Sequence, residues 1–288
     1  MARRSLAARL ERVSKNLRRA AEANLKQAED IHRLRTSSRR AAAAVVLFRP
    51  LLPKKGARWF EKQLRKIRRV AGDVRDLDVM LAQVAQGKKS LSKEKSDLLD
   101  ELTKRRRHAQ QPLKGLRKSL EKNNKFASKQ ETLLQDLKKP DNSMQQDKPP
   151  RLREWGGCRL APQISEFLEL GNKKLGVVAS AHEFRIAGKE LRYVIEIVGG
   201  AFPAPAARVY ALLSELQQKI GVICDHAAAE RMYEELASTI AKSDRKYLQA
   251  QVAAERKLRV ATHKAFLRWW TPRRRKAMAA LFAKAGLL

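Results

Sequence analysis

The sequence predicts an all-α protein, and three observations support this fold class. The 288 residues are rich in Ala, Leu, Lys, Arg, Gln and Glu, which favour helices. No sustained alternation of apolar and polar residues occurs, so strands are not indicated. Helix-breaking residues are confined to a few short segments, and the predicted helices between them are therefore long.

From the N-terminus onward, the helix-breaking segments predict turns and a linker. The segment Pro50–Pro53 predicts a turn in the first half, and residues 87–90, Gly-Lys-Lys-Ser, predict a weaker one. Residues 140–157 contain three Pro and two Gly without a helical period, which indicates a linker. In the second half, the segments 199–205 and 271–272 predict further turns. The linker separates two nearly equal halves, residues 1–139 and 158–288.

The two halves share a sequence pattern. Both His32–Arg39 and His182–Lys189 read His-x-apolar-Arg-x-x-x-(Arg/Lys), and a Pro-bearing turn and a second helix follow each. Each half then carries Gly-x-x-x-Asp, at Gly72–Asp76 and Gly221–Asp225, which we expect to lead into a third helix. A match of order and spacing over about 45 residues predicts two duplicated helical bundles.

Each His motif lies on a predicted helix. At the spacing of an α-helix, its residues form one apolar side and one basic side. In the first half the apolar side runs from Leu34 to Phe48, and the cations lie about 100° to 160° away. In the second half the apolar side runs from Phe184 to Val198. The first three basic residues take the same relative positions, and Arg192 extends the stripe at about 80°. The two basic stripes are His32, Arg35 and Arg39, and His182, Arg185, Lys189 and Arg192.

Such a stripe can follow a linear polyanion along one helix edge. Arg offers a planar fork of donors that suits phosphate oxygens, and Lys adds a point charge. Neighbouring cations should lower the pKa of His32 and His182, and a bound phosphate should reverse this effect. We therefore expect binding to strengthen below about pH 6.5. A single stripe could equally be a solvated helix face, but its repetition together with the His favours a binding role.

The second helix differs between the halves. Arg65, Arg68 and Arg69 in the first half correspond to Ser214, Gln217 and Gln218 in the second. An anion site built from both halves is therefore expected to be richer in charge on the first-half side. Asp76 and Asp225 are expected to orient the cations rather than to act as metal ligands or catalytic acids.

The charge of the chain points to an anionic partner. The 63 Lys and Arg outnumber the 30 Asp and Glu, which gives a formal net charge of +33. Nucleic acid, an anionic membrane surface or another polyanion could compensate it. The longest apolar run, Ala41–Phe48, is far shorter than the roughly 20 residues of a membrane-spanning helix, so no membrane insertion is expected. No secretory signal is visible and only two Cys occur, so a cytoplasmic location is expected.

Several functional classes lose support because their motifs are missing. The sequence has no phosphate-binding loop of the Walker type, no His-Glu-x-x-His and no Gly-x-Ser-x-Gly. No Cys and His cluster has metal-ligand spacing, so neither a metal nor a cofactor is expected. Aromatic residues rarely fall among the basic stripes, which disfavours a single-strand nucleic-acid binder.

The motifs resemble those of the CHAD family, the conserved histidine α-helical domain. The resemblance rests on His32–Arg40, Gly72–Val79, His182–Tyr193 and Gly221–Asp225, in this order. It implies two four-helix bundles related by a pseudo-twofold axis, around a central basic pore that binds inorganic polyphosphate. The residues that match the family's basic motif positions are His32, Arg35, Arg39, Arg75, His182, Arg185, Lys189 and Arg192.

The expected function is non-enzymatic binding of inorganic polyphosphate or other phosphate and sulfate anions. Arg65, Arg68 and Arg69 are expected to add to the site. Such a protein could lie on polyphosphate granules or recruit partners to them. Two alternatives stay open at this point: a basic helical protein that binds nucleic acid on its outer surface, and a phosphohydrolase or phosphate-transfer enzyme that uses Asp76 or Asp78.

Overall fold

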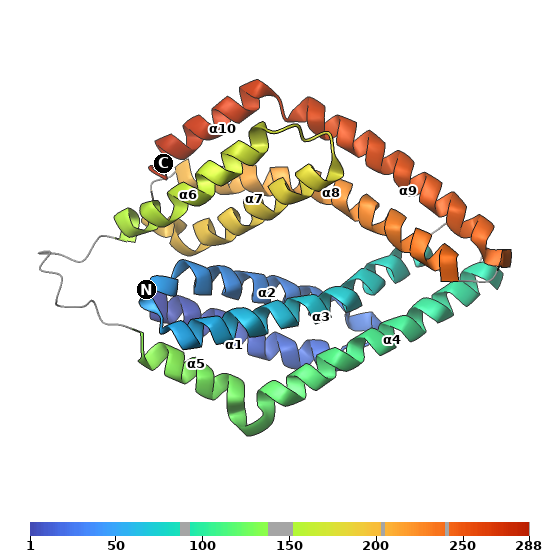
Figure 1. Ribbon diagram of the computed structural model, residues 1–288, viewed down its shortest axis with the longest axis horizontal. Helices are drawn as coiled ribbons and strands as arrows, with labels where there is room; N and C mark the ends of the chain where they lie inside the picture. Colours follow the sequence, from blue (N-terminus) through green and yellow to red (C-terminus); the bar gives the residue numbers. More distant parts are fainter. Residues whose placement is uncertain (87–92, 138–151, 203–204, 240–241, 288) are drawn as a thin grey trace, which may run out of the picture. The chain divides into compact units, whose positions relative to one another are not determined.

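The computed structural model describes residues 1–86, 93–137, 152–202, 205–239 and 242–287. All regular structure within these ranges is helical, as predicted. The chain divides into two compact units, Met1–Asp147 (unit 1) and Lys148–Leu288 (unit 2) (Figure 1). No helix in the described ranges is long and apolar enough to cross a membrane.

In unit 1, α2 contacts both α1 and α3, and α3 also contacts α4 (Figure 1). Its α-helices are α1 Ala2–Glu22, α2 Ala28–Leu47, α3 Lys54–Gln86, α4 Lys93–Glu121 and α5 Lys125–Gln135, with short 3₁₀ turns at Leu25–Gln27, Arg49–Leu51 and Lys122–Asn124. The apolar side predicted for α2 is confirmed, because its predicted members from Leu34 to Phe48 are all buried. Burial of this side, rather than helix propensity alone, fixes α2 in the bundle.

Unit 2 is built around α7 and α8, and α9 runs beside α8 (Figure 1). Its α-helices are α6 Leu152–Asn172, α7 Val178–Val198, α8 Pro205–Thr239, α9 Lys242–Trp269 and α10 Pro272–Lys284, with a 3₁₀ turn at Gly199–Ala201. The predicted apolar side of α7 is likewise buried from Phe184 to Val198. Phe167 of α6 stacks on Phe184, with ring centroids 4.8 Å apart. The indole of Trp270 donates a hydrogen bond of 2.9 Å to the carbonyl of Gly171 near the end of α6.

The structure corrects the expected linker. Residues 140–151 lie outside the described ranges, but α6 begins at Leu152, so 152–157 is helical. The glycines of this segment suggested a break, but Gly156 serves helix packing. A Cβ at Gly156 would lie 3.3 Å from the ring of Phe202, so a larger residue would crowd this contact.

Two other expectations differ from the structure. Both Gly-x-x-x-Asp motifs lie inside helices, Gly72–Asp76 in α3 and Gly221–Asp225 in α8, and do not lead into a third helix. In the described ranges each unit has five α-helices, whereas four were expected. The fifth helix is short and follows a break after α4 in unit 1 and after α9 in unit 2. In unit 1, left-handed Asn123 and Asn124 separate α4 from α5. In unit 2, Thr271 caps the start of α10 by accepting a hydrogen bond from the Arg274 backbone N–H.

A buried polar cluster fixes the end of α1 to α4. Arg106 is 2% exposed, and its Nε donates to Asp78 Oδ1 at 2.9 Å. The Arg106 guanidinium also donates to the carbonyls of Ala23 and Asn24, at 3.1 and 3.3 Å. Gln110 donates to Ala23 as well, at 2.7 Å. These carbonyls lie at the end of α1, where helix carbonyls lack intrahelical partners, so Asp78 and Arg106 have a structural role.

Candidate anion-binding site

In unit 1 the site is centred on Arg35, which reaches from α2 to α3. Its Nη1 lies 3.7 Å from Asp76 Oδ1, and the side chain of Arg35 is 20% exposed. The guanidinium lies directly over Gly72, where an added Cβ would be only 2.9 Å from Nη1. Gly72 therefore leaves room for the Arg35 side chain. Asp76 lies one helical turn later on α3 and forms an ion pair with the guanidinium.

Unit 2 contains the same arrangement. Arg185 Nη2 of α7 lies 3.8 Å from Asp225 Oδ1 of α8, and its side chain is 19% exposed. A Cβ at Gly221 would lie 3.5 Å from Arg185 Nη2, which is an ordinary contact. In both units the Asp of the repeated Gly-x-x-x-Asp motif faces an arginine of the neighbouring helix. The glycine is needed to make room for the guanidinium in unit 1 but not in unit 2.

The two predicted histidines are exposed residues on the helices that carry these arginines. Burial of the ring, followed by the charge of Arg75, lowers the pKa of His32. Burial, followed by the charges of Arg185 and Lys189, lowers the pKa of His182. The predicted direction is confirmed, although partial burial is a larger cause than the neighbouring cations. Both imidazoles therefore favour the neutral form at pH 7 while no anion is bound.

The remaining cations predicted for unit 1 lie on α2 and α3, which pack against each other. Arg39 and Arg75 are half-buried and act electrostatically on Arg35. Three further arginines lie on α3 before Gly72: Arg65 and Arg69, which are exposed, and Arg68, which is half-buried. The structure thus groups His32, Arg35, Arg39 and Arg75. The other three arginines of α3 lie closer to the start of that helix.

In unit 2, Lys189 and Arg192 continue the stripe along α7, and both are half-buried. Arg192 Nη1 donates to the hydroxyl of Tyr210 at 3.0 Å. The Arg192 guanidinium also lies over two aromatic rings, 5.0 Å from the centroid of Tyr193 and 5.5 Å from that of Tyr210. Tyr210 of α8 therefore positions Arg192, a contact that the stripe pattern did not reveal.

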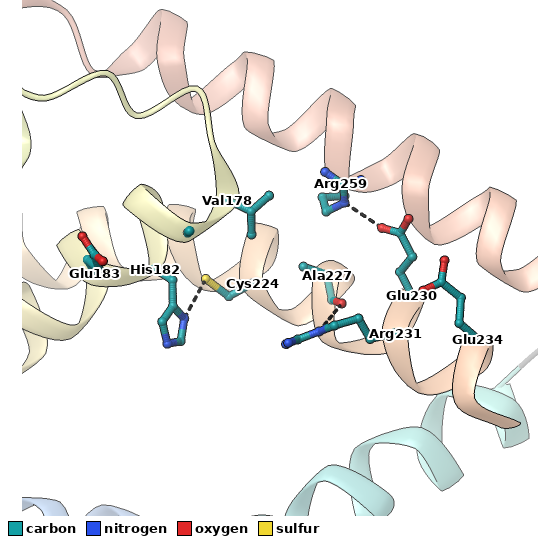
Figure 2. Close-up of a pocket in the computed structure, with 10 residues that line it drawn as sticks. Val178, His182, Glu183, Cys224, Ala227, Glu230, Arg231, Glu234 and Arg259 are labelled. Atoms are coloured by element: carbon teal, nitrogen blue, oxygen red, sulfur yellow. Dashed lines mark hydrogen bonds and ion pairs between the residues drawn. The ribbon is translucent and has the colours of Figure 1, made fainter.

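At the His182 end of the stripe, unit 2 has a cavity of about 580 Å³ between the start of α7, α8 and α9 (Figure 2). Its lining residues are Val178, Ala179, His182, Glu183, Cys224, Ala227, Glu230, Arg231, Glu234 and Arg259. His182 Nδ1 lies 3.8 Å from Cys224 Sγ. Sequence reasoning gave no role to Cys224, which occupies a variable position of the Gly221–Asp225 motif, or to Arg231, which lies outside it. In the first half the position that corresponds to Arg231 is Ala82.

The carboxylates of this cavity have partners of their own. Glu230 accepts hydrogen bonds from Arg256 Nε at 2.6 Å and from Arg259 Nε at 2.7 Å. Arg256 also contacts Glu234 at 3.1 Å. These arginines lower the pKa of Glu230, which is therefore ionised and neutralised by cations. No group of three or more potential metal ligands occurs in the ranges that the structure describes.

Comparisons with known proteins place these features in a family. The family model of the CHAD domain matches residues 4–234. No curated protein sequence matches the chain. The crystal structure of the CHAD domain from the plant Ricinus communis is 22% identical, with a TM-score of 0.60 over 90% of this chain and 89% of that one. PptA from Streptomyces chartreusis is 17% identical, with a TM-score of 0.60 over 93% of this chain and 97% of that one. The fold agrees with the family model, and the chain belongs to the CHAD family.

Proposed function

We propose that this protein binds inorganic polyphosphate through the basic stripes of its two units and acts without catalysing a reaction. The family has polyphosphate-related functions, and the net charge of +33 favours a polyanionic partner. The protein would thereby attach to polyphosphate granules in the cytoplasm or recruit other components to them. The central pore implied by the family resemblance stays a prediction.

The observation that carries this proposal is the paired seating of Arg35 and Arg185. In each unit an arginine is held over a glycine by a carboxylate, 3.7 Å away in unit 1 and 3.8 Å away in unit 2. Partial burial and the nearby carboxylate restrict the guanidinium before a ligand arrives, which lowers the entropy lost on binding. Both arginines keep about a fifth of their side-chain surface exposed, so phosphate oxygens can reach them.

The stripes also suit a chain of phosphates better than a single anion. Cations at every third or fourth residue of a helix lie on one side of it, so consecutive phosphates can each find a donor. Binding of such a chain releases its counterions, and the affinity therefore falls as the salt concentration rises. A catalytic alternative would need Asp76 or Asp78 as an acid or base. Asp76 instead pairs with Arg35, and Asp78 lies buried against Arg106.

The test is a calorimetric titration with polyphosphate chains of defined length, at two salt concentrations. The double variant Arg35→Glu with Arg185→Glu should nearly abolish binding. The matched control, Arg12→Glu with Arg159→Glu, changes the net charge equally at exposed positions of α1 and α6 and should bind almost as the unaltered protein does.

Circular dichroism of each variant checks that the helices persist. Equal losses of affinity in both double variants would mean that overall charge decides binding, and would contradict the proposed site. The absence of polyphosphate binding by the unaltered protein would contradict the function itself.

A further inference from the structure

The cavity of unit 2 is lined by a cation of α8, Arg231, and by the histidine of α7, His182. Arg231 Nε donates to the carbonyl of Ala227 at 3.4 Å, a contact within α8. The guanidinium extends from there toward the His182 ring, as Figure 2 shows. Arg231 also contributes to the lowered pKa of His182, which agrees with their proximity.

Both residues keep donors that face the cavity they line. His182 Nδ1 faces Cys224 Sγ at 3.8 Å, so Nε2 is the ring nitrogen that remains for a ligand. Arg231 is exposed and forms no ion pair with any residue in the described part of unit 2. An imidazole N–H and a guanidinium fork that line one cavity suit an anion with several oxygens.

The acidic residues of the cavity do not compete for this space. Glu230 and Glu234 contact arginines of α9 on the other side of the cavity. The Glu183 side chain points away from the His182 ring in Figure 2. The surface next to His182 and Arg231 is therefore positive, although carboxylates line the same cavity.

We propose that His182 and Arg231 form a clamp for one phosphate group of a polyphosphate chain, beside the thiol of Cys224. The proposal rests on the proposed function and extends it, because it adds a residue outside the repeated motif. The stripe on α7 would then continue onto α8 beyond His182. Since Ala82 occupies the corresponding position in the first half, the clamp is a property of unit 2 alone.

Alkylation of Cys224 by iodoacetamide tests the clamp, with tripolyphosphate as the probe and sodium chloride at equal ionic strength as the reference. Mass spectrometry of peptides gives the rates for Cys224 and for Cys158, the exposed cysteine of α6 that serves as an internal control. At tenfold the dissociation constant, tripolyphosphate should slow the alkylation of Cys224 about tenfold, because about nine-tenths of the sites are then occupied. The rate at Cys158 should not change.

The variant Arg231→Gln should raise the concentration of tripolyphosphate that gives half-protection by about tenfold or more, since a charge-assisted contact to phosphate is lost. The matched control, Arg208→Gln, removes an exposed arginine of the same helix and should leave protection unchanged. Equal protection in Arg231→Gln and in the unaltered protein would overturn the clamp.

A second measurement does not depend on the reactivity of the thiol. The imidazole C–H signal of His182 in an NMR spectrum, assigned with His182→Gln, should shift when tripolyphosphate is added, and should shift less at the same concentration in Arg231→Gln. An unshifted His182 signal would overturn the clamp. If long-chain polyphosphate still binds in that case, the proposed function stands, whereas loss of binding to both ligands contradicts both proposals.

Discussion

Replacement of the two site glycines by alanine should separate stability from binding. Gly72 and Gly221 both lie inside long helices under the guanidinium of an arginine from the neighbouring helix. A Cβ at Gly72 would lie 2.9 Å from Arg35 Nη1, whereas a Cβ at Gly221 would lie 3.5 Å from Arg185 Nη2. The same substitution should therefore displace the arginine in unit 1 and leave it in place in unit 2.

The expected magnitudes follow from these distances. A Gly→Ala change inside a helix stabilises it by about 1 kcal/mol, which corresponds to roughly 2 to 4 °C in the melting temperature of a unit of this size. Gly221→Ala should show this full gain. Gly72→Ala should show less, because Arg35 must move by roughly 0.5 Å to reach an ordinary contact and thereby weakens its partly exposed pair with Asp76, worth about 0.2 to 1 kcal/mol.

The affinity for polyphosphate should change more in Gly72→Ala than in Gly221→Ala. A displaced Arg35 keeps its charge but loses part of its hydrogen bonding to phosphate, which we set at about 1 kcal/mol, or about fivefold in Kd. Gly221→Ala should change Kd by less than about twofold, which is the effect of an undisturbed contact. Calorimetric titration with polyphosphate gives Kd, and differential scanning calorimetry gives the melting temperature.

A third alanine variant controls for helix propensity alone. Gly115 lies inside α4 with no atom within 4 Å of an added Cβ, so Gly115→Ala should stabilise unit 1 without changing Kd. Equal dissociation constants for Gly72→Ala and Gly221→Ala would refute the reasoning, since the position of the Arg35 guanidinium would then have no influence on binding.

Three further predictions concern pH, the core and competing polyanions. Because the folded-state pKa of His32 and His182 is lowered and bound phosphate favours the protonated ring, titrations should show higher affinity as the pH falls below about 6.5. For the same reason the ligand-free protein should lose stability over this range, and affinity that stays flat between about pH 8 and 5.5 would exclude both rings from charge recognition. Arg106→Leu should lower the free energy of unfolding by about 3 to 5 kcal/mol in urea titrations, because Asp78 remains buried without its partner. Short DNA or RNA at an equal phosphate concentration should fail to displace long-chain polyphosphate in a competition assay, and displacement would favour the nucleic-acid alternative.

The local parts of the fold and site could be predicted from the sequence. The buried sides of α2 and α7 follow from helical periodicity, which depends on neighbouring residues alone. The sequence predicts that the motif at Gly72 belongs to a repeat, but the expectation that it leads into a third helix is wrong. The glycine instead makes room for the guanidinium of Arg35, which comes from another helix.

Contacts between distant segments account for what the sequence did not reveal. Arg106 and Asp78 lie 28 residues apart and share no motif, so their pairing depends on how α3 packs against α4. Arg231 and His182 line one cavity because α7 packs against α8. Gly156 looked like part of a linker because its partner, Phe202, lies beyond the whole of α7.

The buried Arg106 and the arginines that contact Glu230 show that part of the formal positive charge of this protein has partners within the fold. Arg106 completes the end of a helix in the core, and Arg256 and Arg259 neutralise one carboxylate. Arg106 is buried and cannot reach a phosphate, and the other two already have a carboxylate partner. The isoelectric point of a homologue should therefore predict its affinity for polyphosphate poorly. The residues that surround the equivalents of Arg35 and Arg185 should predict that affinity better.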